Sequence, residues 1–496
     1  MQLRHSVFGV AATFCAVIVA GVVVDRAAPA RREIVVTVDA TSSIGVSSLR
    51  LGTQFVVPGT LDVVPGTRSR LEALAPPLVR INAAAFGPRP VLPAGIVRGD
   101  WDFGSLDSIV EDARRGGGEV LLTVAYAPEW MWDCGVPAIR DPTFGEFGEY
   151  MARLVAYFDR GSFVAEDGRQ IVNPAGLEHR IRYWELWNEP DQIAGCPPAG
   201  NRITPAEYVA MWNAAVPRML AIDPTIKVIG PATAQAFTAS RPDYLAALLD
   251  GATHKPDIIS FHAYGGWSNS QSDRFLLDGA VGKFGLPAIA QETQAVRAIA
   301  PRTPIWITEL NVNSAWDRDD PTERPWTAFG AAWGASAFRL LALGGADAVF
   351  QYRFSHPDLR QLSLVDERTG SPLLVYWRDY YLARYFPPGS EILSSTSSHA
   401  GIEVLAARPP GSRDVHVLVV DRVPDGGSTL GGPGQAASVR VEVRGPGRGR
   451  AVMLRMVDAR TPLDTGPLET PLGRGAPAIV EFLGYGAAFL AFDGKD

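Results

Sequence analysis

The sequence predicts an α/β protein in which a (β/α)₈ TIM barrel is followed by a C-terminal β-sandwich domain, and three observations support this fold class. Short runs rich in β-branched and aromatic residues recur from residue 50 onward, with stretches of helical apolar spacing between them. This alternation repeats eight times, as in a closed parallel barrel. After Phe386 the helical spacing disappears, and alternating strand patterns follow between Gly- and Pro-rich turns.

The barrel strands are expected where the apolar runs are short and bounded by turn residues. These runs cover residues 51–55, 78–82, 120–124, 181–187, 227–230, 258–261, 305–308 and 348–352. Helices are expected where apolar residues recur every three or four positions, over residues 106–115, 144–158, 206–221 and 326–343. The barrel is therefore assigned to residues 45–386.

The sandwich domain is expected to be discontinuous in sequence. Its strands are predicted over residues 402–406, 415–420, 438–443, 452–457 and 478–492. A further strand over residues 34–38 precedes the barrel, and we expect it to cross over and join the sandwich. The accessory domain therefore comprises residues 31–44 plus 387–496, with Asp425 to Gln435 as a long surface loop.

Composition excludes several functional classes. The 496-residue chain has 46 Lys and Arg against 53 Asp and Glu, giving a net charge of −7 and no basic stripe for nucleic acid. The sequence contains no P-loop, no nucleophile elbow and no zinc-protease motif, and its His residues are scattered singly. We therefore expect neither a metal nor a nucleotide cofactor.

The N-terminus has the features of an export segment. Residues 6–24 are uncharged and rich in Val and Ala, they follow Arg4, and the small-residue sequence Ala-Pro-Ala occupies 28–30. The length suits a membrane anchor, whereas the small residues suit cleavage. We expect residues 1–30 to be a signal peptide or an N-terminal membrane anchor. The folded part then lies outside the cytoplasm, either secreted or attached through residues 6–24.

An exported chain gives its cysteines a specific interpretation. Cys134 and Cys196 remain once the segment carrying Cys15 is set aside, and one disulfide is the simplest arrangement in an oxidising compartment. They follow neighbouring strands, so a bridge would brace the rim of the barrel. Two unpaired thiols are the alternative.

Two carboxylates stand at predicted strand ends, where the active site of such a barrel is built. Glu189 closes the fourth strand and Glu309 closes the seventh. Strands four and seven lie across the opening of a ring of eight, so the two side chains are expected to face each other. Paired carboxylates suit glycosidic bond cleavage, which needs a proton donor and an anion. A separation of about 5–5.5 Å gives retention and about 6.5–9.5 Å gives inversion, and the residues alone leave both open.

The motifs around these residues resemble a known group of enzymes. The strings Trp187-Asn188-Glu189-Pro190-Asp191, Trp306-Ile307-Thr308-Glu309 and Ile259–Tyr264 resemble glycoside hydrolase clan A. Within the clan the chain is most similar to glycoside hydrolase family 39, the β-xylosidase and α-L-iduronidase group. The resemblance implies a retaining glycosidase acting on a poly- or oligosaccharide, with Glu189 as acid/base and Glu309 as nucleophile.

Other strand-end residues are assigned supporting roles. Asn188 is expected to donate to the sugar 2-hydroxyl, which requires the strand end to depart from strict alternation. Arg80 would hold Glu309 ionised, and Tyr264 would donate a hydrogen bond to the same carboxylate. His262 would bind a sugar hydroxyl or the carboxylates. The remaining substrate contacts are expected from Gln54 and Tyr352.

Aromatic residues in the loops are further candidates for sugar stacking. Trp130, Trp132, Trp187 and Trp267 lie in or beside βα loops, and we expect about half of them to touch substrate. Arg353 departs from the tryptophan common at this part of the clan. It would either meet the carboxylate of a uronic acid or pair with a protein acid.

Two other functions fit the same residues. One is a non-catalytic glycan-binding protein that keeps the groove, although both carboxylates are present. The other is a transglycosylase acting in exopolysaccharide processing, which differs only in what attacks the intermediate.

Overall fold

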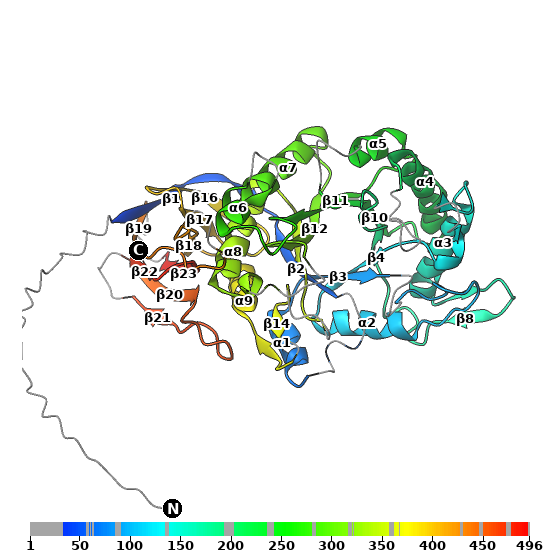
Figure 1. Ribbon diagram of the computed structural model, residues 1–496, viewed down its shortest axis with the longest axis horizontal. Coiled ribbons are helices and arrows are strands. Elements are labelled where there is room, and N and C mark those ends of the chain that lie inside the picture. The colour runs from blue at the N-terminus through cyan, green and yellow to red at the C-terminus, as the bar shows by residue number, and fades with distance from the viewer. Residues whose placement is uncertain are drawn as a thin grey trace, which may run out of the picture. The chain divides into compact units, whose positions relative to one another are not determined.

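The barrel and the second sheet are both present in the computed structural model of the chain (Figure 1). The structure describes residues 33–55, 59, 61, 64–84, 91–133, 138–192, 203–235, 243–279, 284–315, 320, 322–356, 362–366, 368–426, 430–445, 450–472 and 478–494.

Eight parallel strands close into a barrel in the order β10-β11-β12-β13-β2-β3-β4-β9. Their bounds are β2 (Arg50–Phe55), β3 (Leu78–Ala83), β4 (Glu119–Val124), β9 (Tyr183–Leu186), β10 (Lys227–Thr233), β11 (Ile258–Tyr264), β12 (Ile305–Asn311) and β13 (Ala348–Gln351). Each strand coincides with one of the eight predicted runs, so the predicted barrel is confirmed.

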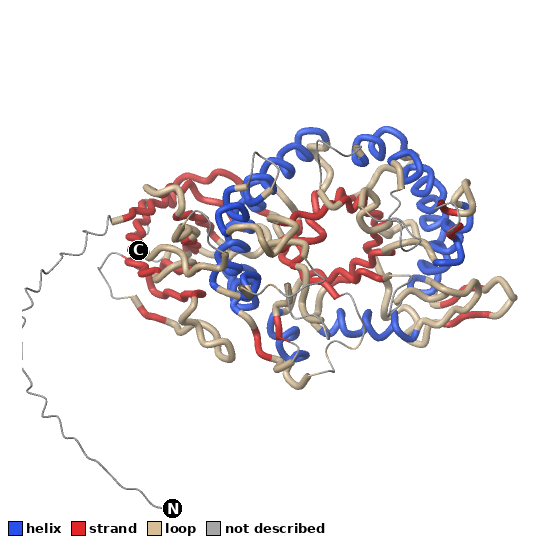
Figure 2. The backbone as a smooth tube through the Cα atoms, viewed as in Figure 1, coloured by secondary structure: helices blue, strands red, loops and turns tan. Residues whose placement is uncertain are grey.

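Helices surround this ring of strands (Figure 2). They are α1 (Thr67–Leu74), α2 (Gly104–Arg115), α3 (Gly145–Asp159), α4 (Pro205–Ile222), α5 (Tyr244–Gly251), α6 (Asp273–Asp278), α7 (Gly285–Ile299), α8 (Ala328–Gly344) and α9 (Leu374–Tyr385), with short 3₁₀ turns η1 (Glu129–Met131) and η2 (Arg324–Trp326). Local chemistry explains where α4 begins: Thr204 accepts from the backbone N–H of Glu207, whose carboxylate accepts from the Thr204 backbone.

Three short antiparallel pairs occupy loops where the sequence analysis predicted no strands. They are β5 (Trp132–Asp133) with β6 (Ala138–Ile139), β7 (Ser162–Val164) with β8 (Gln170–Val172), and β14 (Val365–Asp366) with β15 (Ser371–Pro372). Two- and three-residue strands are too short to give a periodic signal in sequence.

The floor of the barrel is an apolar layer at the N-terminal ends of the strands. Its members are Leu78, Leu121, Tyr183, Ile229, Ile258, Trp306, Ala348 and Phe350. Side chains alternate between the inside and the outside of a barrel strand. Residues two positions further along each strand therefore form the next interior layer, towards the end where the candidate residues lie.

The C-terminal strands form a nine-stranded sheet in the order β21-β20-β23-β18-β17-β16-β1-β19-β22. The bounds are β1 (Ile34–Ser47), β16 (Ser390–Ser397), β17 (Ile402–Arg408), β18 (Val415–Asp421), β19 (Ala437–Arg444), β20 (Arg450–Asp458), β21 (Thr470–Pro471), β22 (Ala478–Phe482) and β23 (Gly486–Asp493). Leu454 of β20 and Val480 of β22 share one apolar cluster although they stand near opposite ends of this order. The sheet is therefore curled into two layers around a common core.

The strand before the barrel lies in this second sheet. β1 pairs antiparallel with β16 and parallel with β19, and its register shifts between Asp39 and Gly45. Such irregularities bend a strand and let it leave one layer for another. The chain therefore passes from the second sheet directly into β2.

One detail of the C-terminal part differs from the sequence expectation. Residues 478–492 are two strands, β22 and β23, because a turn containing Gly484 separates them. A Cβ on Gly484 would lie 1.9 Å from the carbonyl oxygen of Pro433, so only glycine fits there. Most described residues of the predicted surface loop, Asp425 to Gln435, are exposed, and the backbone N–H groups of Gly431 and Gly432 anchor it by donating to Asp273 of α6.

Helix α8 packs on the second sheet as well as on the barrel. Arg339 donates to the carbonyl of Val404 in β17, and Phe329 meets Tyr485 edge to face with ring centroids 5.2 Å apart. A helix covered on two sides must be apolar nearly all round, which explains the apolar sequence of α8.

Among the helices of the described ranges, no span is long and apolar enough to cross a bilayer. Residues 6–24, for which an export segment is predicted, lie outside those ranges.

Candidate active site

The second interior layer of the barrel is polar and charged. Arg80 follows Leu78 by two positions on β3, Thr123 follows Leu121 on β4, and Glu185 follows Tyr183 on β9. All three side chains are fully buried. Buried charges are tolerated only when they are paired, and here Arg80 and Glu185 form an ion pair of 2.8 Å.

Glu309 reaches the interior through a break in strand register. On β12, Trp306 points into the barrel, so strict alternation would direct residue 309 outward. The register between β11 and β12 shifts, with Phe261 opposite Ile307 but His262 opposite Glu309. The extra residue, Thr308, is a bulge that turns Glu309 inward beside His262.

Glu189 is positioned by an irregular chain beyond β9. Trp187 has φ 72° and Glu189 has φ 47°, both in the left-handed region. The Glu189 N–H donates to the carbonyl of Ala232 at 2.8 Å, which ties this turn to the end of β10. The predicted departure from strict alternation after residue 186 is therefore observed.

The two glutamates face each other with His262 between them. One oxygen from each carboxylate and one ring nitrogen of His262 all lie within 4.8 Å of one another. His262 Nδ1 is 2.9 Å from Glu189 Oε1 and 3.6 Å from Glu309 Oε2. The two carboxylates predicted to face each other from opposed strand ends are therefore close neighbours in the structure.

Arg80 is the hub of the network. Its Nε donates to Glu185 Oε2 at 2.8 Å and its Nη1 donates to Glu309 Oε1 at 2.6 Å. Its Nη2 donates to Asn188 Oδ1 at 2.8 Å. The planar guanidinium therefore holds two carboxylates and one amide in a fixed relation, which a lysine ammonium lacks the geometry to do.

Glu309 is held in its ionised form. Burial alone would raise its pKa, but the nearby His262 and the Arg80 guanidinium outweigh burial and the net pKa is lowered. Tyr264 donates to Glu309 Oε2 at 2.6 Å and adds to the same effect. The pKa of Glu309 therefore lies below its ordinary value, which favours the ionised form.

Glu189 is held in the opposite state. Burial raises its pKa, and the negative charge of Glu309 adds to this, while the hydrogen bond from His262 lowers it by less. Its side chain is 20% exposed, against 6% for Glu309. The carboxyl group with the raised pKa is the one whose side chain is more accessible to solvent.

The proton of His262 is assigned by its neighbours. In the neutral imidazole, Nε2 would be the acceptor, because it lies 3.5 Å from Arg80 Nη2, which has only protons to offer. The Nδ1–H then donates to Glu189 Oε1. Burial lowers the His262 pKa, but Glu309 and Glu189 raise it by more.

Asn188 is oriented by the same network. Its Oδ1 accepts from Arg80 and, at 3.4 Å, from Asn82 Nδ2. This fixes the amide so that its NH₂ group points the other way, towards Tyr126, with which it shares a hydrogen bond. Towards the described residues the other N–H of this amide makes no hydrogen bond, in keeping with the role expected for Asn188.

Four residues of the network were missed by the sequence analysis: Thr123, Glu185, Tyr126 and Asn82. Thr123 Oγ1 donates to Glu185 Oε2 at 2.7 Å, so this carboxylate is shared between Thr123 and Arg80. Strand alternation contained the signal for these two, because each follows an apolar floor residue by two positions. Burial of Tyr126 strongly raises its pKa, so its hydroxyl stays protonated.

The remaining substrate candidates on the strands are enclosed. Gln54 is fully buried, accepts from Arg80 Nη1 at 2.9 Å and approaches Glu309 Oε1 at 3.5 Å. It lies within the carboxylate network rather than on its surface. Tyr352 is 9% exposed and packs edge to face on Tyr264, and the buried Arg353 donates to its hydroxyl at 3.4 Å.

The four tryptophans divide into packed and exposed rings. Trp187 is fully buried against Tyr126, Trp132 and Phe147, so it is a packing residue. Trp132 is 9% exposed and packs on the same cluster.

The other two indoles lie further out. Trp130 donates to the carbonyl of Ala94 and carries the Arg98 guanidinium over its ring at 5.0 Å. Trp267 is 55% exposed and braced by Phe275 and Phe284, which makes it the open ring among the four. Cys134 and Cys196 lie outside the described residues.

Within the described ranges, Glu189, His262 and Glu309 are close enough to share a metal ion. Their donor set is already used, because Arg80 and Tyr264 donate to the two oxygens of Glu309 and His262 donates to Glu189. A cation would have to displace the Arg80 guanidinium, which is itself the counter-charge. The arrangement fits proton transfer and nucleophilic attack without an added cofactor.

A (β/α)₈ barrel with two opposed carboxylates at its C-terminal mouth defines the class of protein: a glycosidase. The family model described as glycosyl hydrolases family 39 matches residues 152–335, a span that contains Glu189, His262 and Glu309. The similarity to family 39 predicted from the sequence is confirmed by this match. In the comparison with curated proteins nothing matches.

Solved structures share the fold over nearly the whole chain. The family 39 enzyme of Xanthomonas axonopodis pv. citri aligns with TM-score 0.64 and 16% identity, covering 94% of this chain and 98% of that one. A monomeric β-xylosidase of Caulobacter crescentus CB15 gives 0.64 and 16%, covering 92% and 99%. An α-L-arabinofuranosidase of Thermotoga maritima gives 0.62 and 14%, covering 92% and 99%. These likenesses establish the fold.

The hydrogen bond from Tyr264 to Glu309 gives a first prediction. Replacing Tyr264 by Phe removes one donor from the Glu309 carboxylate, so the pKa of Glu309 rises. Under the nucleophile role proposed for Glu309 below, activity needs its ionised form, so the acidic limb of the kcat/KM profile should move up by about one pH unit. The pH–rate profile measures this. Tyr376→Phe, whose hydroxyl bonds the backbone of Arg70 far from the site, serves as the control. An unmoved acidic limb would contradict the assignment.

Proposed function

We propose that the chain is a retaining glycosidase in which Glu309 is the nucleophile and Glu189 the acid/base. One observation carries the proposal: the two carboxylates lie within 4.8 Å and their pKa values are driven in opposite directions. A separation near 5 Å suits direct attack by one carboxylate, whereas inversion needs about 6.5–9.5 Å to admit a water. Two carboxyl groups in opposite protonation states provide the acid and the anion of the reaction.

In the first step Glu309 attacks the anomeric carbon while Glu189 donates its proton to the departing glycosidic oxygen. The bond between the anomeric carbon and that oxygen breaks, and a covalent glycosyl ester of Glu309 forms. Because an ester is neutral, Glu309 loses its negative charge in this step. Burial still raises the Glu189 pKa, but the added repulsion from Glu309 ends at the moment when Glu189 becomes a carboxylate.

In the second step Glu189 takes a proton from water, and the resulting hydroxide attacks the anomeric carbon. The ester bond breaks and Glu309 is restored as an anion stabilised by Arg80 and Tyr264. His262 keeps its Nδ1–H on Glu189 Oε1 in both steps, so the other oxygen transfers the proton. Asn188 supplies an N–H for the 2-hydroxyl beside the reacting carbon.

Covalent labelling tests the assignment of the nucleophile. The glycone is first chosen by screening aryl xyloside, glucoside, arabinoside and uronide. An activated 2-fluoro sugar of that glycone should then label the native chain on Glu309, with mass spectrometry of peptides as the readout. Glu309→Gln should abolish labelling, and a labelled Glu309→Gln chain would refute the assignment.

The matched variant Glu189→Gln keeps the nucleophile. It should still be labelled, and it should hydrolyse substrates with poor leaving groups about 10²–10⁴ times more slowly. Product analysis separates the alternatives: water as acceptor indicates hydrolysis, and a sugar acceptor indicates transglycosylation. A native chain that binds the glycan but is never labelled would be a glycan-binding protein.

The pKa directions predict a bell-shaped pH profile. Both glutamates start from an ordinary pKa of 4.5, which is lowered for Glu309 and raised for Glu189. Activity needs Glu309 ionised and Glu189 protonated, so it is lost as pH falls through the first pKa and as pH rises through the second. The limbs of kcat/KM should therefore fall on either side of 4.5. A profile that rises monotonically through neutral pH would contradict the assignment of Glu189.

We also propose that the protein acts outside the cytoplasm. The support is the uncharged run over residues 6–24, followed by small residues at 28–30. Expression of the full chain with a C-terminal tag and fractionation of the cells should place it in the secreted or membrane fraction. N-terminal sequencing then shows whether the chain begins near residue 31 or keeps its first residues. A chain found in the cytoplasm at full length would overturn the proposal.

A further inference from the structure

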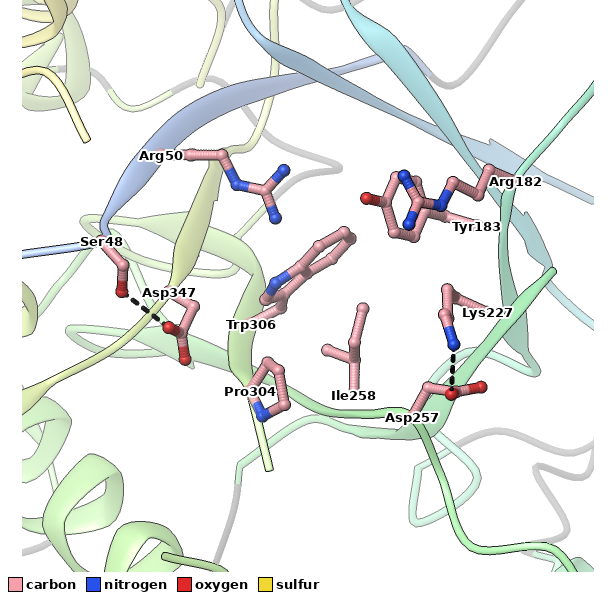
Figure 3. A pocket seen from close by; sticks show the side chains of 10 residues that line it. All are labelled: Ser48, Arg50, Arg182, Tyr183, Lys227, Asp257, Ile258, Pro304, Trp306 and Asp347. Carbon is pink, nitrogen blue, oxygen red and sulfur yellow. Dashed lines mark hydrogen bonds and ion pairs between the residues drawn. The ribbon is translucent and has the colours of Figure 1, made fainter. Parts of the chain in front are cut away.

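A second polar cavity lies at the opposite end of the barrel from the glutamates. Its volume is about 380 Å³, within the range of small-molecule sites. It is lined by residues at the N-terminal ends of the strands, among them Arg50 of β2, Tyr183 of β9, Lys227 of β10 and Trp306 of β12 (Figure 3). The apolar floor layer separates it from the carboxylate network.

The acidic residues of this cavity are already satisfied. Asp257 accepts from Lys227 Nζ at 2.9 Å and from the backbone N–H of Val228 at 3.0 Å. Asp347 accepts from Ser48 Oγ at 2.6 Å, from the N–H of Ile305 at 2.9 Å and from Arg297 at 3.1 Å. The negative charges of Asp257 and Asp347 are therefore compensated by these hydrogen bonds and ion pairs.

Two guanidinium groups are held differently. Those of Arg50 and Arg182 make no hydrogen bond within the described ranges, and their ion pairs are to Glu119, at 4.0 and 3.8 Å. Each stands over an aromatic ring instead, with Arg50 5.0 Å from the centroid of Trp306 and Arg182 5.4 Å from that of Tyr183. Figure 3 shows the two groups pointing toward each other across the cavity.

Two like charges directed into one space repel each other, and one half-exposed carboxylate beyond hydrogen-bond range compensates them weakly. Guanidinium groups donate two parallel N–H bonds to planar or tetrahedral oxyanions. The aromatic rings below them fix their orientation before any ligand arrives. An oxyanion placed between them would gain donors that are already directed at it.

We propose that the N-terminal mouth of the barrel binds a small anion carrying a carboxylate or phosphate group, held between Arg50 and Arg182. Lys227, the third cation of the cavity, is already paired with Asp257, so the two arginines are the groups left to hold the anion. The site is separate from the glycosidase centre, and the proposal does not depend on the roles assigned to Glu189 and Glu309. The ligand is either an acidic sugar or a phosphate, which share the oxyanion that these donors recognise.

Calorimetric titration of the full chain tests the site. The probes are inorganic phosphate and glucuronate, with glucose as the uncharged control, at constant ionic strength in a buffer free of phosphate. At least one anion should bind and glucose should not. Binding of glucuronate alone indicates an acidic saccharide, and binding of phosphate alone indicates a phosphate ligand; either outcome supports the proposal. The absence of binding by both anions would overturn it.

Matched variants locate the binding. Arg50→Gln and Arg182→Gln should each weaken anion binding about tenfold or more while hydrolysis of an aryl glycoside is unchanged. Arg274→Gln is the control, because Arg274 is 65% exposed and makes a similarly long ion pair of 3.7 Å to Asp278. Equal weakening in all three variants, or none in the first two, would show a nonspecific charge effect and overturn the site.

Nuclear magnetic resonance of the indole N–H of Trp306 reports where the anion binds, in addition to how tightly it binds. Arg50 stands over this ring, so an anion that draws the guanidinium away should shift the indole signal. The signal is assigned with Trp306→Phe. The shift should appear in the native chain and be absent in Arg50→Gln. If calorimetry detects anion binding but the Trp306 indole signal does not shift, the anion binds outside this cavity and the proposal is rejected.

Discussion

The carboxylate network depends on one buried guanidinium. Arg80 has no exposure to solvent, yet it donates to Glu185, Glu309 and Asn188 at once. Removing a charge of this kind leaves its partners buried and unpaired, a penalty of about 3–5 kcal/mol. Glu185 is therefore as much part of the site as Glu309, because it supplies the second negative charge that keeps Arg80 in place. The position of the Glu309 carboxylate and the direction of the Asn188 amide both follow from the contacts of this guanidinium.

The chemistry arises from an asymmetry between two identical side chains. Glu309 is surrounded by donors, from Arg80 and Tyr264, so its charged form is favoured. Glu189 is desolvated by burial, which outweighs the donor from His262, and the negative charge of Glu309 adds to it, so the pKa of Glu189 is raised. The two pKa directions are thus set by the surroundings of each carboxyl group rather than by the groups themselves. The double displacement that we propose makes use of this difference, because it needs one residue as acid and then base, and the other as nucleophile.

The barrel uses its two ends for different purposes. At the C-terminal end the interior charges are compensated within a closed network of side chains. At the N-terminal end the guanidinium groups of Arg50 and Arg182 are directed into open space over aromatic rings. The floor layer of apolar side chains insulates one end from the other. The second sheet lies against helix α8 through Arg339 and Phe329, and the 425–435 segment reaches Asp273, so the accessory strands support the barrel wall.

The sequence by itself determined the eight barrel strands, the class of chemistry and the pair Glu189 and Glu309, because strand periodicity and a local motif are properties of short segments. It also pointed to Arg80, Tyr264 and His262 through their places on strands. Only the tertiary structure showed how Glu309 comes to face inward as expected, since a bulge at Thr308 reverses the regular alternation along β12. It also decided that Gln54 and Trp187 are enclosed, and that the carboxylate of Glu185 is shared between Arg80 and Thr123. These outcomes depend on register and on contacts between distant strands, and no local pattern in a single chain encodes either one.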